Sequence, residues 1–222
     1  MASTKNTEIV LLRHAHSTAN LKGILAGRDN KIGLSPRGKR EAEDLVTVLS
    51  AYTFDAIYTS PLKRCLETIA PYLKASDKSS IVEENIVEME YGEWSGKPLV
   101  KLARLKLWAS IQSRPSTVRF PGGESFSEMS LRANQAIIDR SAGAERILVV
   151  SHGDVIKSVV AFHLGLPLDS FQRISIDPAS ISTIRYPSSH VTSVNVTSHL
   201  SREEKSGHKR DRFSLGGGSG RI

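Results

Sequence analysis

Hydrophobic residues in this chain gather in short uninterrupted runs that alternate with longer amphipathic segments. Residues 9–12 (Ile-Val-Leu-Leu) and 147–150 (Ile-Leu-Val-Val) are wholly apolar, which is typical of parallel strands covered on both faces. The pattern predicts the following elements: strands at 9–12, 55–60, 81–82, 147–150, 171–176 and 181–186, and helices at 17–21, 35–49, 62–73, 98–111, 126–142 and 154–164. Strands that alternate with helices predict an α/β fold, a three-layer sandwich with helices on both faces of a mainly parallel central sheet.

The composition changes at residue 187. From there to the end the chain has eight serines, five glycines and few large apolar residues. A chain of 222 residues suits one large domain with a core of its own. We therefore expect a single domain over residues 1–186 and a flexible, basic, Ser/Gly-rich tail over residues 187–222.

The formal net charge of +7 and the isoelectric point of about 9.6 indicate anionic partners. The predicted tail holds six basic and three acidic residues, so three of the seven excess charges lie there. Five basic side chains of the tail offer a nucleic-acid-binding alternative: Arg202, Lys205, Lys209, Arg210 and Arg212. Because no aromatic residues are interleaved with them, we favour a solvated tail, and we expect a small phosphorylated partner and no nucleic acid.

A single cysteine, Cys65, rules out an internal disulfide framework and fits a reducing compartment. We expect its thiol to pack as a small hydrophobic group. No charged segment precedes a long apolar one at the start, and no apolar run approaches the roughly 18 residues that span a membrane. The expected location is therefore cytoplasmic, without membrane association.

The candidate chemistry lies where the two apolar strands end. The first runs into Arg13 and His14, and the second runs into Ser151 and His152. A lone histidine at a strand end is usually structural, but two at matching positions would converge if the strands are neighbours. Arg64 follows another predicted strand and would join them.

Two arginines and two histidines around one point would form a pocket for a doubly charged oxyanion. Guanidinium groups bind phosphate oxygens in pairs and stay charged at any physiological pH. Positive neighbours also favour the neutral form of an imidazole, which is the form that attacks phosphorus. We therefore predict His14 as a nucleophile beside the cationic group of Arg13.

Five motifs in order resemble the histidine phosphatase superfamily, in its phosphoglycerate-mutase-like branch, over about residues 8–186. They are Arg13-His14-Ala15, the stretch Ser-Pro-Leu-Lys-Arg-Cys-Leu-Glu-Thr at 60–68, Glu88 with Gly-Glu-Trp-Ser-Gly at 92–96, Pro-Gly-Gly-Glu-Ser at 121–125, and Ser151-His152-Gly153. The resemblance implies the phosphoglycerate mutase-like fold and a reaction that needs neither a metal nor another cofactor.

The resemblance also implies a role for each matching residue. His14 would become the phosphohistidine, Gly27 would line the substrate side, and Glu88 would give a proton to the leaving oxygen. Four side chains would hold and orient the phosphate: Arg13, Asn20, Arg64 and His152. Glu88 lies in an acidic run, so only the motif favours it over Glu90.

The resemblance leaves the reaction open between phosphomonoester hydrolysis and phosphomutase activity. His152 follows Glu88 by 64 positions (152 − 88), whereas family mutases carry a longer insertion there, so we predict a phosphatase. A non-catalytic phospho-ligand binding protein would have lost His14 or Glu88, and neither is lost. Where the family has glycine after the nucleophile this chain has Ala15, and we expect that position to need only a small side chain.

Overall fold

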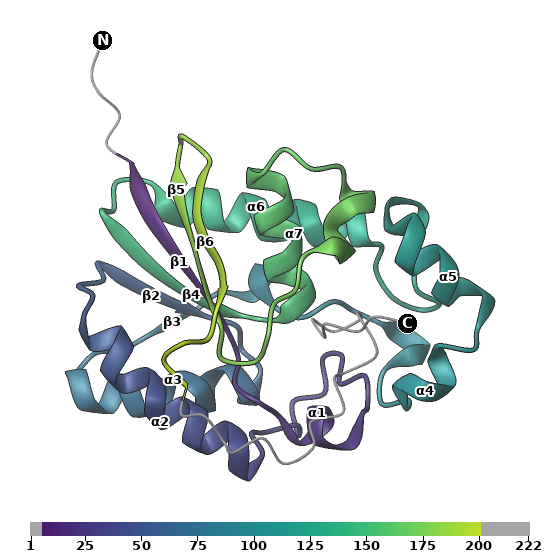
Figure 1. Cartoon of the computed structure of the whole chain (residues 1–222), viewed down its shortest axis with the longest axis horizontal. Coiled ribbons are helices and arrows are strands. Elements are labelled where there is room, and N and C mark those ends of the chain that lie inside the picture. The colour runs from purple at the N-terminus through teal and green to yellow at the C-terminus, as the bar shows by residue number, and fades with distance from the viewer. Residues whose placement is uncertain (1–5, 201–222) are drawn as a thin grey trace.

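The computed structural model describes residues 6–200 of the chain. Within these residues a six-stranded sheet lies at the centre, in the order β3-β2-β4-β1-β5-β6 (Figure 1). The strands are β1 (Thr7–Arg13), β2 (Ala56–Thr59), β3 (Ile81–Val82), β4 (Arg146–Ser151), β5 (Ile181–Tyr186) and β6 (His190–Val196). The first four in sequence pair in parallel, whereas β5 and β6 are antiparallel to their neighbours. The predicted mainly parallel sheet is confirmed.

Helices cover both faces of the sheet, and further helices lie beyond the carboxyl ends of its parallel strands (Figure 1). They are α1 (Thr18–Lys22), α2 (Pro36–Ser50), α3 (Lys63–Ser76), α4 (Leu99–Leu102), α5 (Lys106–Ser113), α6 (Phe126–Ser141) and α7 (Gly153–His163). Four short 3₁₀ helices are also described: η1 (Glu84–Ile86), η2 (Gly92–Trp94), η3 (Pro115–Thr117) and η4 (Leu168–Arg173). None of the helices in residues 6–200 has both the length and the apolar character that crossing a bilayer requires.

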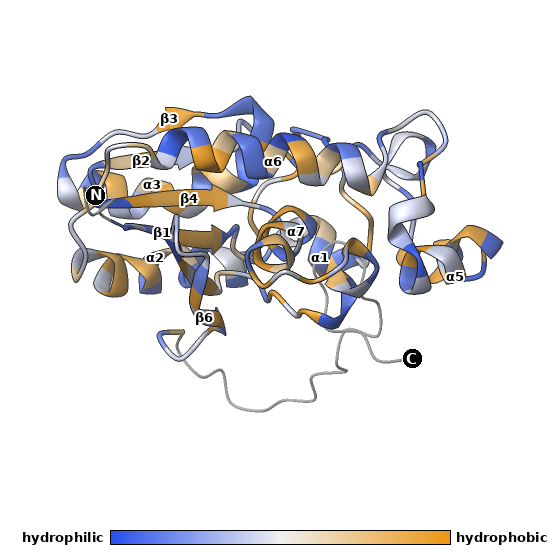
Figure 2. Cartoon of the chain, turned by 90° about the horizontal axis from the view of Figure 1, so that it is seen from above, coloured by the Kyte–Doolittle hydropathy of each residue, from blue (hydrophilic) through white to orange (hydrophobic). Residues whose placement is uncertain are grey.

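Both faces of β1 are buried, which explains why its apolar residues do not alternate with polar ones. Ile9 and Leu11 belong to the core cluster that contains α6 and α7 residues, whereas Val10 and Leu12 belong to the cluster that contains α2 and α3 residues. All four side chains are fully buried, and β1 and β4 are among the most hydrophobic segments of the chain (Figure 2). Side chains of one strand therefore fill both cores, because successive residues point to opposite faces.

Serine caps begin two of the long helices that flank the sheet, α2 and α6. Ser35 accepts from the backbone N–H of Gly38 at the start of α2, where Pro36 occupies the first turn. Ser125 and Glu128 form a reciprocal capping box at the start of α6. The glycines at 122–123 lie in the turn before this cap.

Two predicted elements and the predicted domain boundary differ from the structure. The range 98–111 is two helices, α4 and α5. The strand predicted at 171–176 is wrong, because η4 occupies the first half of that range and buries Phe171 against Phe126 of α6. The domain boundary at residue 186 is too early, since β6 pairs with β5 and extends the sheet. Its alternating half-buried pattern, with few large apolar residues, suits an edge strand and gives a weak sequence signal. Residues 201–222 of the predicted tail, with its basic side chains, lie outside the described part.

Candidate active site

The carboxyl ends of β1 and β4 bring the two histidines together. Arg13 pairs in register with Ser151, so the residues that follow, His14 and His152, occupy matching positions. The His14 backbone N–H donates to the Ser151 carbonyl at 2.9 Å, and the two imidazole centroids are 5.3 Å apart. The matching strand ends of the sequence thus correspond to one place in the fold.

Two buried guanidinium groups accompany the histidines. Arg64, in the first turn of α3, donates from Nη2 to the Gly27 carbonyl at 2.8 Å. In the described part of the chain its Nε and Nη1 have no hydrogen-bond partner, although the side chain is only 1% exposed. Arg13 donates from Nη1 to the Ile176 carbonyl at 2.6 Å. Buried donors of this kind are costly unless they bind an acceptor, and an anion would supply one.

The charge of these arginines acts on both imidazoles. Burial, then the charges of Arg64 and Arg13, hold the pKa of His14 well below its usual value. Burial and Arg64 lower the pKa of His152 in the same way. Nδ1 of His14 lies 2.8 Å from the carbonyl oxygen of Ala15, which can only accept, so Nδ1 carries the proton. The neutral ring therefore has its lone pair on Nε2.

Glu88 lies in the irregular segment between η1 and η2 and is 4% exposed. Its Oε1 accepts from the Met89 backbone N–H at 3.0 Å, and its Oε2 is 3.8 Å from Nδ1 of His152. Burial, together with the charge of Asp154, raises the pKa of Glu88 to about 7, with the charge of Arg64 opposing. Glu90 instead forms a partly exposed ion pair with Arg28. The two glutamates thus differ in burial, and only Glu88 is placed beside the histidines.

The structure places Asn20 and Gly27 in the segment that follows β1. Asn20 accepts from the backbone N–H and hydroxyl of Ser17 as part of the capping box of α1, so its amide NH₂ is the group suited to an anion. Gly27 has a φ of +55° and supplies the carbonyl that holds Arg64. Ala15 is fully buried and is not among the residues with positive φ, which confirms that a small side chain suffices there.

Two hydroxyl groups of the site were not predicted. Ser60, which follows β2, lies 2.7 Å from Nε2 of His152 through its Oγ. Thr68 accepts from the Ala15 backbone N–H at 2.9 Å. Ser60 could have been found, because it is a polar residue at the end of a strand like His14 and His152. Cys65 packs 3.5 Å from Nε2 of His152, and burial raises the pKa of its thiol to about 12, so it is an unreactive packed residue.

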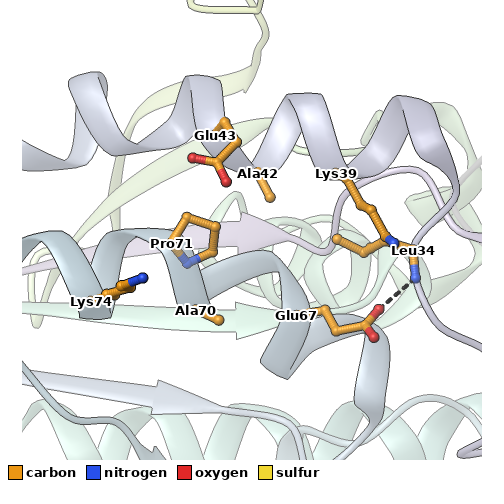
Figure 3. A pocket seen from close by; sticks show the side chains of 8 residues that line it. All are labelled: Leu34, Lys39, Ala42, Glu43, Glu67, Ala70, Pro71 and Lys74. Carbon is orange, nitrogen blue, oxygen red and sulfur yellow. Dashed lines mark hydrogen bonds between the residues drawn. The ribbon is translucent and has the colours of Figure 1, made fainter.

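A separate groove of about 370 Å³ lies between α2 and α3 (Figure 3). Its lining mixes apolar side chains with both charges: Leu34, Lys39, Ala42, Glu43, Glu67, Ala70, Pro71 and Lys74. Glu67 accepts from the Leu34 backbone N–H at 2.7 Å and is therefore engaged in the fold. The groove brings together no set of groups suited to phosphoryl transfer, in contrast to the ends of β1 and β4.

Known proteins resemble this chain over nearly its whole length. Phosphoserine phosphatase 1 of Hydrogenobacter thermophilus is 30% identical over 211 residues, covering 91% of this chain and 98% of that protein. A 2,3-bisphosphoglycerate-dependent phosphoglycerate mutase of Parvibaculum lavamentivorans is 31% identical, covering 79% and 86%. A crystal structure of Entamoeba histolytica phosphoserine phosphatase with 3-phosphoglyceric acid superposes with a TM-score of 0.78 at 28% identity, covering 87% of this chain and 99% of that one. The family model of the histidine phosphatase superfamily (branch 1) matches residues 9–198. The chain belongs to the histidine phosphatase superfamily.

Proposed function

We propose that this enzyme hydrolyses small phosphomonoesters through a phosphohistidine at His14, with Glu88 as the acid and base. The observation that carries the proposal is the combination of a neutral, oriented imidazole with two buried guanidinium groups. Arg64 has nitrogens available for phosphate oxygens in the described structure, and guanidinium groups stabilise the charge that develops on a transferring phosphoryl group. The cytoplasmic location stays a prediction.

In the first step, the Nε2 lone pair of His14 bonds to phosphorus as the bond to the leaving oxygen breaks. Glu88 gives its proton to that oxygen, which its pKa near 7 allows at neutral pH. In the second step, the Glu88 carboxylate takes a proton from a water molecule, whose oxygen attacks phosphorus. The nitrogen–phosphorus bond breaks, phosphate leaves, and both side chains return to their starting states. Arg13, Arg64, His152 and Asn20 hold the phosphate in this proposal.

We propose small carboxylated alkyl phosphates as the substrate class. Support comes from the phosphoserine phosphatase relative and from the Entamoeba enzyme with bound 3-phosphoglyceric acid. The resemblance to a phosphoglycerate mutase favours isomerisation of the same compounds as the second candidate reaction. Both reactions share the phosphohistidine and differ in whether water or the product reaches it next.

Incubation with 3-phosphoglycerate separates the two reactions. We expect inorganic phosphate and glycerate to appear in equal amounts, without added metal, because water completes the second step. Phosphorus NMR follows all species in one sample. Formation of 2-phosphoglycerate without free phosphate would contradict the hydrolase proposal while leaving the phosphohistidine intact.

Replacing Arg64 with methionine should weaken phosphate binding without weakening the fold. Hydrogen bonds to charged groups are worth about 1.5–3 kcal/mol, so inhibition by inorganic phosphate should weaken by about 10- to 150-fold. The free energy of unfolding should not fall, because a buried charge beside other cationic groups is costly before the anion binds. The readouts are phosphate inhibition and urea unfolding, with Lys63→Met at the exposed neighbouring position as control. Unfolding at much lower urea would mean that Arg64 acts mainly in the fold.

A further inference from the structure

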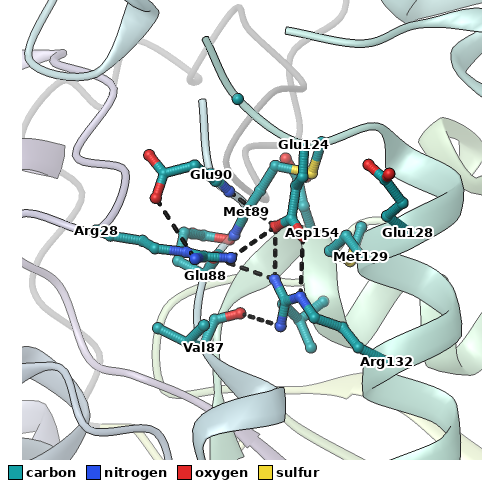
Figure 4. A network of polar contacts seen from close by, with 12 residues as sticks. Arg28, Val87, Glu88, Met89, Glu90, Glu124, Glu128, Met129, Arg132 and Asp154 are labelled. Carbon is teal, nitrogen blue, oxygen red and sulfur yellow. Dashed lines mark hydrogen bonds and ion pairs between the residues drawn. The ribbon is translucent and has the colours of Figure 1, made fainter. Parts of the chain in front are cut away.

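The segment that carries Glu88 is held by an arginine from a distant helix. Arg132 of α6 donates from Nη1 to the carbonyl of Val87 at 2.8 Å and from Nη2 to the carbonyl of Glu88 itself at 3.2 Å (Figure 4). Nη1 also donates to the carbonyl of Asn85 at 2.7 Å. Residues 87–91, between η1 and η2, lack the regular hydrogen bonds of a strand or helix. Side-chain donors therefore take the place of secondary structure in fixing this backbone.

Glu124 joins this arginine to a second one. Its Oε1 and Oε2 accept from Nη2 and Nε of Arg132 at 2.6 Å and 3.0 Å, a two-pronged pair. Oε1 also accepts from Arg28 Nη2 at 3.0 Å and from the Glu90 backbone N–H at 2.8 Å. Burial opposes ionisation, but the Arg132 hydrogen bond and charge, the Glu90 N–H and the Arg28 charge together lower the pKa of Glu124. The carboxylate stays charged and holds both guanidinium groups in place.

The second arginine closes the arrangement around Glu88. Arg28 donates from Nε to the Glu88 carbonyl at 2.9 Å, so two guanidinium groups meet on that one oxygen. The residue before it, Gly27, supplies the carbonyl that holds Arg64. One loop thus contacts both the backbone of the proposed acid and a phosphate-binding arginine, which fixes their relative position.

We propose that Arg28, Glu124 and Arg132 form a clamp that positions the Glu88 carboxyl against the leaving oxygen. The inference rests on the proposed role of Glu88. The three side chains are positioning residues, because the contacts described for them are to the backbone of residues 85–90, to one another and, for Arg28, to the Glu90 carboxylate. A displacement of about 1 Å at a reacting group costs on the order of 100-fold in rate, so loss of the clamp should reduce proton donation selectively.

The test compares two substrates that need the acid to different degrees. Arg132→Met should lower kcat for 3-phosphoglycerate by about 10- to 100-fold, and kcat for 4-nitrophenyl phosphate by less than about threefold, because nitrophenolate leaves without a proton. Arg132→Lys keeps the positive charge but loses the planar guanidinium that donates to several oxygens at once. It should therefore show the same difference between the two substrates. Glu124→Gln removes the charge and replaces one accepting oxygen with an NH₂ group, and should show the same difference between the substrates in weaker form. Arg119→Met is the matched control. Arg119 pairs with the exposed Glu128 and donates to the carbonyl of Gly123, the residue before Glu124, so the change removes an arginine near the clamp without removing a contact described for the Glu88 backbone.

Each outcome decides between a clamp and a purely structural role. Equal losses on both substrates in Arg132→Lys and Glu124→Gln would overturn the clamp, since a general loss of folded enzyme affects every substrate alike. Circular dichroism checks folding, and if Arg132→Met does not fold, the other two variants decide. Glu88→Gln is measured in parallel. If Glu88→Gln loses more kcat on 3-phosphoglycerate than on 4-nitrophenyl phosphate and the clamp variants do not, the clamp alone is overturned. If Glu88→Gln loses kcat equally on both substrates, the assignment of Glu88 as the acid is overturned, and the clamp with it.

Discussion

Replacing His14 with alanine or asparagine should lower turnover of every phosphomonoester by at least about 10⁴-fold, because no other group at the site takes over bond formation to phosphorus. Asparagine fills much of the same space and can still hydrogen bond, but it lacks the ring nitrogen lone pair. The loss should therefore be alike for 4-nitrophenyl phosphate and for alkyl phosphates. Phosphate release under saturating substrate measures it directly.

The covalent intermediate gives an independent readout of the same substitution. A phosphohistidine has a nitrogen–phosphorus bond, which is labile in acid and stable in alkali, so rapid alkaline quenching with labelled substrate should trap it in the parent and not in the variants. His16→Ala is the control from the same segment after β1, since His16 forms a hydrogen bond to the Ser35 hydroxyl through Nδ1. It should retain turnover within about threefold. A labelled enzyme in His14→Asn would remove His14 from the proposed role.

The sequence was most informative where burial and chemistry meet at a strand end. An apolar run predicts a strand whose two faces are both covered, which is typical of the parallel strands inside an α/β sheet. Arg13, His14 and His152 could therefore be expected to converge, on the condition that these two strands are neighbours. The sheet order with β4 beside β1 agrees with that expectation.

Contacts to the main chain could not be predicted in this way. Gly27 holds Arg64 through a carbonyl, and Arg132 holds the Glu88 segment through three carbonyls, yet every residue type has a carbonyl. Such interactions have no signature in side-chain type or spacing. Glu88 illustrates the same limit, since burial separates it from Glu90 in the fold while both appear as one acidic run in sequence.

Glu88→Gln should reduce turnover of alkyl phosphates by about 10²- to 10⁴-fold and that of 4-nitrophenyl phosphate far less. The amide keeps the size of the side chain but has no proton to give to an alkoxide. The Brønsted dependence on leaving-group pKa should therefore steepen, and a series of aryl and alkyl phosphates measures it. His152 is 3.8 Å away, and its neutral ring is a poor substitute acid.

The titration of Glu88 sets the direction in which the activity of the parent enzyme changes with pH. Below a pKa of about 7 Glu88 holds its proton, and above it the carboxylate cannot donate, so kcat/KM for alkyl phosphates should fall about tenfold per pH unit on the alkaline side. His14 has a pKa well below its usual value, so its ring is still neutral at pH 6.5 and activity should persist into mildly acidic solution. In Glu88→Gln the alkaline decline should disappear, because glutamine does not titrate. An unchanged alkaline limb in the variant would assign that titration to another group and would leave Glu88 without its role as the acid.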